Sequence, residues 1–146
     1  MNKKLPVQFH FLISCTLANR GLLKKFIHSI FKLEKRSLER INIIFCDDKY
    51  LLGLNRQFLQ HDYYTDILSF PLSEANKPIV GEIYISVDRV RENARSVDST
   101  FTEELHRVIF HGVLHFCGYL DKSGSDITLM RIKEEQYLNA YKKVLS

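Results

Sequence analysis

Short segments with alternating or β-branched and aromatic residues are interleaved with longer segments in which apolar residues recur every three or four positions. Alternation places every second side chain on one face of a strand, whereas the longer period gives a helix one apolar stripe. The pattern predicts strands at residues 7–12, 38–45, 66–70 and 79–86. It predicts helices at residues 19–35, from Asp47 or Asp48 to about 60, and at residues 87–96, 102–117 and 126–144.

Residues that begin or end helices stand at the borders of these segments. Asn19 can cap the first helix, and Thr100 with Glu103 forms a capping box before the fourth. Gly118 ends the fourth helix as a left-handed cap. The segments 66–70 and 79–86 are expected to pair as a hairpin-like unit. The fold class predicted is α+β, a single small domain over residues 1–146 with a mixed four-stranded sheet packed with about five helices.

Composition narrows the class of protein. The chain has 146 residues, 45% of them hydrophobic, which suffices for one core, and no apolar run approaches the length of a membrane span. A cytoplasmic location is therefore expected, with no membrane partner. Cys15, Cys46 and Cys117 lie among apolar neighbours without a C-x-x-C spacing, so buried thiols are expected rather than disulfides. The net charge of +4 suits a polyanionic partner but does not require one.

The strongest chemical signal is the sequence HGVLHFCGYLD at residues 111–121. On a helix, His111 and His115 project from one face about one turn apart and can grip one metal ion. Gly112 stands where the H-E-x-x-H zinc helix carries its general-base glutamate, so a metalloprotease is not the first interpretation.

Histidines four residues apart also occur as ordinary helix residues, and the spacing alone is a weak signal. The residues that follow strengthen this signal, because Gly118 ends the helix and a turn there can fold Asp121 toward the histidines. Zinc accepts imidazole nitrogen and carboxylate oxygen at similar distances, and three protein ligands leave a fourth position for water. His111, His115 and Asp121 are therefore predicted to bind one Zn²⁺ ion on this central helix and the loop that follows it.

Several motifs together resemble the YbeY family of bacterial metallo-endoribonucleases. They are Leu54-Asn55, TDILSFP at residues 65–71, GEIYIS at residues 81–86 and the histidine motif, in matching order over about residues 54–134. The resemblance implies a single-zinc enzyme that hydrolyses single-stranded RNA. It also implies work in maturation of the 3′ end of small-subunit ribosomal RNA and in ribosome quality control, with ribosomal RNA and the small subunit as partners and no DNA expected.

The chain departs from the family pattern at four positions, which are Asp121 in the histidine motif and Phe58, Leu59 and Tyr64 in and after the second predicted helix. Asp121 stands where the family usually has its third histidine, so the third ligand would be a carboxylate. The site could then prefer harder metal ions than a three-histidine site does. Leu59 stands where the family has an arginine, although Arg56 lies one turn earlier and could reach the same cleft. Asp62 and Asp66 match the pattern, and we interpret them mainly as turn and strand-capping residues.

The resemblance does not name a general acid or base. Glu104, seven residues before His111 on the same helical face, is a weak candidate for proton transfer. RNA contacts are expected from Arg56, Tyr119 and Lys122, with Arg89, Arg91, Arg95 and Arg131 as further basic residues. Two alternatives stay open: a small zinc hydrolase of another substrate class, and a non-catalytic ribosome-associated RNA-binding protein with a structural metal.

Overall fold

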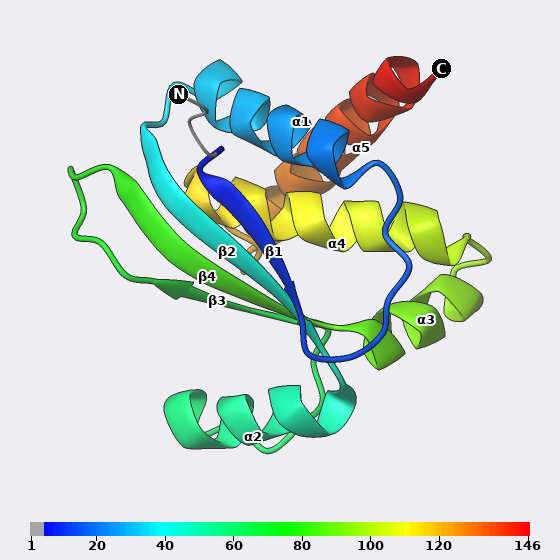
Figure 1. Ribbon diagram of the computed structural model, residues 1–146. Coiled ribbons are helices and arrows are strands. Elements are labelled where there is room, and N and C mark those ends of the chain that lie inside the picture. Colours follow the sequence, from blue (N-terminus) through cyan, green and yellow to red (C-terminus); the bar gives the residue numbers. More distant parts are fainter. Residues whose placement is uncertain (1–4) are drawn as a thin grey trace.

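The computed structural model describes residues 5–146, which form one mixed sheet and five helices (Figure 1). The elements in chain order are β1 (Val7–Phe11), α1 (Arg20–Leu33), β2 (Leu38–Cys46), α2 (Asp48–Leu59), β3 (Ile67–Pro71), β4 (Ile79–Ser86), α3 (Val87–Ser96), α4 (Phe101–Phe116) and α5 (Gly124–Leu145). The predicted fold class is confirmed, and the bounds differ from the predicted ones by a few residues.

The strands lie in the order β1-β2-β4-β3. β1 pairs with β2 and β2 with β4 in parallel, whereas β3 pairs with β4 antiparallel, which confirms the expected hairpin-like unit. The sheet is therefore mixed, as predicted.

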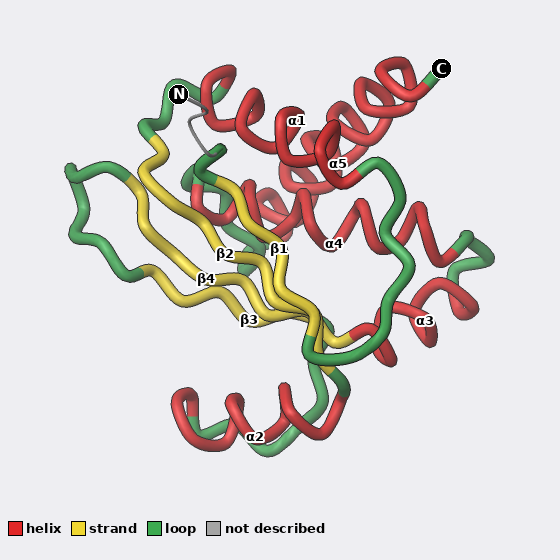
Figure 2. Tube along the Cα trace, in the orientation of Figure 1, coloured by secondary structure: helices red, strands yellow, loops and turns green. Residues whose placement is uncertain are grey.

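The two faces of the sheet carry different cores. Alternate residues of β2, Ile41, Ile43 and Phe45, are fully buried in the main core with residues of α1, α3, α4 and α5. The opposite face has a smaller cluster in which Leu51 of α2 packs with Cys46 and Leu68. Figure 2 shows the same division, with α1, α4 and α5 on one side of the strands and α2 apart from them.

The helix ends can be compared with the caps that the sequence predicts. The Thr100 hydroxyl accepts a hydrogen bond from the Glu103 backbone N–H, as the capping box predicts, but the Glu103 carboxylate pairs with Lys142. Gly118 has φ +102°, in the left-handed region expected of it. Asn19 occupies the N-cap position of α1 as expected, but it adopts a left-handed conformation (φ 57°) and its side chain makes no cap hydrogen bond.

Gly112 lets α4 lie close to the sheet. A Cβ atom at this position would approach Cδ1 of Ile67 to 2.8 Å and Cδ1 of Ile83 to 3.0 Å. Contacts this short require the neighbours to shift, so position 112 has no room for a larger side chain without repacking. The face of α4 that carries Gly112 thus packs against the sheet, and the neighbouring face carries the histidines.

The cysteines behave as ordinary packing residues. Cys46 and Cys117 are buried free thiols, and burial raises the pKa of each to about 12, which makes them poor nucleophiles. Cys15 is half-buried. Among residues 5–146, no helix combines the length and apolarity that crossing a membrane requires.

Candidate metal centre

Three donor atoms converge where α4 ends. The Nε2 atoms of His111 and His115 are 3.1 Å apart, and Oδ2 of Asp121 lies 3.3 Å from the first and 3.1 Å from the second. α4 supplies both imidazoles on one face, and the turn at Gly118 returns the chain so that Asp121 faces them. In the described part of the chain this is the one group of three such side chains whose ligand atoms lie within 4.8 Å of one another.

The second nitrogen of each ring is held by an acceptor. Nδ1 of His111 donates to Oε2 of Glu134 at 2.6 Å, and Nδ1 of His115 donates to the backbone oxygen of Tyr119 at 2.9 Å. A carboxylate and a carbonyl can only accept, so both rings in their neutral form carry the proton on Nδ1. Both Nε2 lone pairs therefore point toward the Asp121 carboxylate, an arrangement that a cation at their centre would satisfy.

The spacing of the three atoms matches a small four-coordinate ion. A tetrahedral ion with bonds of about 2.0–2.1 Å has ligand atoms about 3.3–3.4 Å apart. The observed separations of 3.1 to 3.3 Å are close to this value. His111, His115 and Asp121, the three ligands predicted from the sequence, can thus hold a metal ion together.

Glu134 of α5 fixes one side of the centre. Its side chain is 7% exposed and lies between His111 and Arg107, with Nη1 of Arg107 3.6 Å from Oε1 of Glu134. Burial alone would lower the pKa of His111, but the hydrogen bond and charge of Glu134 outweigh it and raise that pKa above its usual value. Arg107 also approaches Glu104 and Glu135 and so ties α4 to α5 beside the metal ligands.

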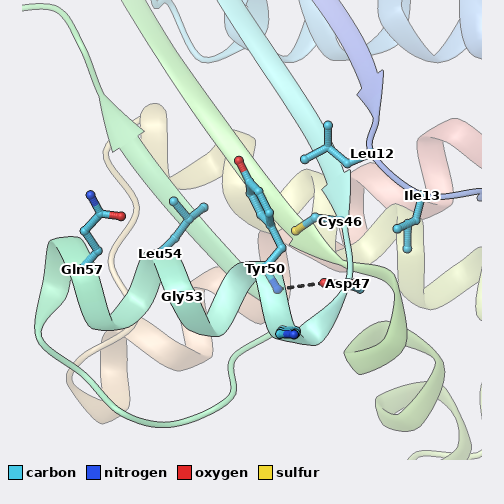
Figure 3. A pocket seen from close by; sticks show the side chains of 9 residues that line it. Leu12, Ile13, Cys46, Asp47, Tyr50, Gly53, Leu54 and Gln57 are labelled. Carbon is cyan, nitrogen blue, oxygen red and sulfur yellow. Dashed lines mark hydrogen bonds between the residues drawn. The ribbon is translucent and has the colours of Figure 1, made fainter.

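The donors lie on the wall of a cavity of about 690 Å³. The cavity is bounded by the start of β3 and by residues of α3, α4 and α5, with Asp66, Glu104, Arg107, His111, Asp121, Arg131 and Glu134 among its polar lining. A second cavity of about 530 Å³ lies between α2 and the ends of β1 and β2, where Leu12, Cys46 and Tyr50 face one another (Figure 3). No described residue lines both cavities, so the metal centre belongs to the first alone.

Three more carboxyl groups line the cavity of the metal centre, those of Glu104, Asp66 and Glu135. Glu104, the weak candidate for proton transfer, is 7% exposed, and its Oε2 has no hydrogen-bond partner. Burial raises the pKa of Glu104, and burial likewise raises the pKa of Asp66. Asp66 therefore lies beside the candidate site, which our interpretation of it as a turn and strand-capping residue did not anticipate.

The residues predicted to contact RNA are not all in the cavity. Arg56 is exposed at the end of α2 and pairs with Asp62, while Lys122 is exposed directly after Asp121. The Tyr119 hydroxyl donates to the Glu34 carboxylate at 2.7 Å, so its ring is fixed from within the protein.

The other expected basic residues are scattered. Arg131 lines the cavity, and Arg89 pairs with Asp48 and stacks over Tyr64. Arg91 stacks over Phe101, and Arg95 pairs with Glu92. Leu59, at the position of the family's arginine, is 43% exposed on α2.

Glu134 and Arg107 were not predicted from the sequence to lie at the metal centre. Both stand in helices among many other charged residues, and no spacing rule marks them. The signal that could have found Glu134 is chemical: a histidine that binds a metal through Nε2 needs an acceptor for Nδ1–H, and carboxylates commonly serve.

Comparisons with known proteins indicate one family. A profile described as endoribonuclease YbeY matches residues 15–142. The chain is 48% identical over 126 residues to the endoribonuclease YbeY of Cytophaga hutchinsonii, covering 86% of this chain and 88% of that protein. It is 45% identical to the Flavobacterium psychrophilum protein of the same name, with 92% and 96% covered.

A solved structure shares the fold. The solution structure of a Thermotoga maritima protein superposes with a TM-score of 0.58 at 30% identity, covering 90% of this chain and 86% of that one. Together with the matches in sequence, this likeness confirms the resemblance and the expected enzyme class. The chain belongs to the endoribonuclease YbeY family.

Proposed function

We propose that the protein is a zinc-dependent endoribonuclease that hydrolyses phosphodiester bonds in single-stranded RNA. The observation that carries the proposal is the convergence of His111, His115 and Asp121 on the wall of a large cavity, with both Nδ1 atoms already engaged. Membership in a family of endoribonucleases supplies the reaction class.

The donor set favours zinc over harder ions. Two imidazole nitrogens and one carboxylate oxygen at tetrahedral spacing suit Zn²⁺, whereas Mg²⁺ and Ca²⁺ prefer oxygen ligands alone. When bound, zinc would polarise a phosphate oxygen and lower the pKa of a water molecule. The negative charge of Asp121 makes this effect weaker than three neutral imidazoles would allow.

The surrounding residues hold this chemistry in place. Glu134 and the Tyr119 carbonyl fix the orientation and tautomer of the two histidines, so that both Nε2 lone pairs face the ion. Glu104 lies in the same cavity with an unpaired oxygen, and burial raises its pKa, as is common for a carboxyl group that transfers protons.

The substrate would lie across the cavity mouth. We propose Arg131, which lines the cavity, and Lys122, which directly follows Asp121, as phosphate contacts near the centre. Arg56 lies outside the cavity on α2, so it would contact a more distant part of the RNA backbone. Tyr119 is half-buried with Lys133 Nζ 5.4 Å from its ring centroid, and it is a candidate for base stacking on its other face. The proposed biological role is maturation of small-subunit ribosomal RNA at its 3′ end and quality control of ribosomes in the cytoplasm.

Substitution of the metal ligands distinguishes a zinc-dependent endoribonuclease from a non-catalytic RNA-binding protein with a structural metal. His111→Ala and Asp121→Ala are each expected to lose bound zinc and to abolish cleavage of a single-stranded RNA oligonucleotide. His10→Ala is the control, because His10 is exposed on β1 and contacts Asn42. Variants that lose zinc yet cleave RNA at the wild-type rate would refute the proposal, and RNA binding without any cleavage by the wild type would favour the binding protein.

A second pair of variants tests Glu104. Glu104→Gln should keep its zinc but cleave about 10²-fold to 10⁴-fold more slowly, the usual range for loss of a general acid or base. Glu103→Gln is the matched control, since the neighbouring carboxylate pairs with Lys142 outside the cavity. Equal rates for the two variants would remove Glu104 from the mechanism.

A further inference from the structure

The end of α1 lies against the loop that carries the third metal ligand. The Glu34 side chain is 11% exposed and accepts hydrogen bonds from Tyr119, Tyr137 and Lys133. The Tyr119 hydroxyl is 2.7 Å from Oε1, and Lys133 Nζ is 3.3 Å from Oε2. Burial alone would raise the pKa of Glu34, but these hydrogen bonds outweigh it and hold the pKa below its usual value.

Tyr119 connects Glu34 to the metal centre. Its ring is held by Glu34, while its backbone oxygen accepts the Nδ1–H of His115 at 2.9 Å. Its backbone N–H donates to the Leu114 oxygen at 3.1 Å, so both backbone groups of Tyr119 turn back onto α4. Asp121 follows two residues later, and its position depends on where Tyr119 is anchored.

Arg36 holds the same loop from the other side of the turn. Its Nε donates to the backbone oxygen of Cys117 at 3.1 Å. A Cβ atom on Gly118 would lie 2.9 Å from Nη2 of Arg36, so the guanidinium packs directly on the turn. The α1–β2 connection therefore contacts the loop both before and after Gly118.

We propose that Glu34 is a positioning residue of the metal centre, acting through Tyr119 on His115 and Asp121. This inference rests on the proposed metal centre and adds a residue far from it in sequence. The three donors to Glu34 divide into two kinds: Tyr119 belongs to the metal loop, whereas Tyr137 and Lys133 belong to α5. A carboxylate that merely stabilises the fold would depend on both tyrosines alike.

Two tyrosine variants separate positioning from stability. Tyr119→Phe and Tyr137→Phe each remove one hydroxyl that donates to the same carboxylate, so Tyr137→Phe is the matched control. Zn²⁺ affinity is measured by competition with a chromophoric chelator, the geometry by the visible absorption of the Co²⁺-loaded protein, and folding by thermal unfolding of the metal-free protein.

Tyr119→Phe is expected to weaken Zn²⁺ binding by about 10-fold and to alter the Co²⁺ spectrum, as loss of a group that orients ligands does. Tyr137→Phe should stay within about twofold of wild type and keep its spectrum. Glu34→Ala should reproduce the weakening seen with Tyr119→Phe, and if it does not fold, the tyrosine pair still decides the question.

The outcomes distinguish this inference from the proposed function. Wild-type protein that binds neither Zn²⁺ nor Co²⁺ would overturn the metal centre and the inference with it. The positioning role alone would be overturned if the wild type binds metal and Tyr119→Phe keeps the wild-type affinity and spectrum. Equal losses of Zn²⁺ affinity in the two tyrosine variants would overturn it as well.

Discussion

Replacing Glu134 by glutamine keeps the size of the side chain and removes the charge that faces His111. The Glu134 carboxylate is buried and accepts from Nδ1 of His111 at 2.6 Å, a short charge-assisted hydrogen bond. A glutamine oxygen can still accept from Nδ1–H, so the ring keeps its tautomer. Arg107 loses one of three carboxylate neighbours and keeps Glu104 and Glu135.

The expected cost has two parts. A hydrogen bond to a charged group contributes about 1.5–3 kcal/mol and a neutral one about 0.5–1.5 kcal/mol, so metal-free Glu134→Gln should be less stable by about 1–2 kcal/mol. Loss of a carboxylate that supports a ligating histidine weakens metal binding by about 10-fold to 100-fold. At about 1.4 kcal/mol per factor of ten, this is about 1.4–2.8 kcal/mol of binding free energy.

Chelator competition measures the affinity for Zn²⁺, and urea denaturation of the metal-free protein measures the stability. Glu135→Gln is the control: it makes the same change in charge one residue later and also neighbours Arg107, but its side chain is 54% exposed. Wild-type zinc affinity in Glu134→Gln, or an equal loss in both variants, would refute the view that Glu134 orients His111.

Three further predictions concern acid stability, packing and the third ligand. The folded pKa of Glu34 lies below the ordinary value of 4.5, so its contribution to stability is present above about pH 4.5 and is lost as the pH falls through the folded value. Glu34→Gln should therefore flatten the fall of the unfolding free energy below pH 4.5 in urea titrations, and an unchanged slope would contradict this. Gly112→Glu should cost more than about 3 kcal/mol, because it forces a carboxylate between α4 and the sheet, and recovery of protein with wild-type urea stability would contradict the packing. Asp121→His removes a negative charge from the ligand set and should move the acidic limb of the pH profile of RNA cleavage to lower pH, whereas a shift to higher pH would count against Asp121 as a ligand.

Features set by neighbouring residues could be predicted from the sequence. The Thr100 cap and the left-handed Gly118 depend on a few adjacent backbone groups, and both occur where expected. α5 begins at Gly124, two residues before the predicted start, because Ser123 and Asp126 form a capping box that we did not recognise. Asn19 shows the limit of such rules, since the same residue type favours both caps and left-handed turns.

The ligand set was predictable for a similar reason. His111, His115 and Asp121 lie within eleven consecutive residues, so a helix and one turn suffice to bring them together. Glu134 and its neighbour Glu135 look alike in sequence, yet one is buried against His111 and the other faces solvent. Only the packing of α5 on α4 separates the two.

Glu34 was beyond prediction for a further reason. It lies 85 positions before Tyr119 in the chain, and their hydrogen bond forms only once α1 has packed across the sheet. Contacts of this kind depend on the whole fold, and no spacing or periodicity of residues in the sequence predicts them.

The close contact of Gly112 with the sheet limits which residues of this helix can take part in catalysis. In an H-E-x-x-H helix the residue after the first histidine must face the substrate, whereas here that residue faces Ile67 and Ile83. A carboxylate introduced at position 112 would therefore enter the packing against the sheet and could not reach a substrate beside the histidines. The glycine after the first histidine is thus a packing requirement of this helix, and any general base has to come from another position.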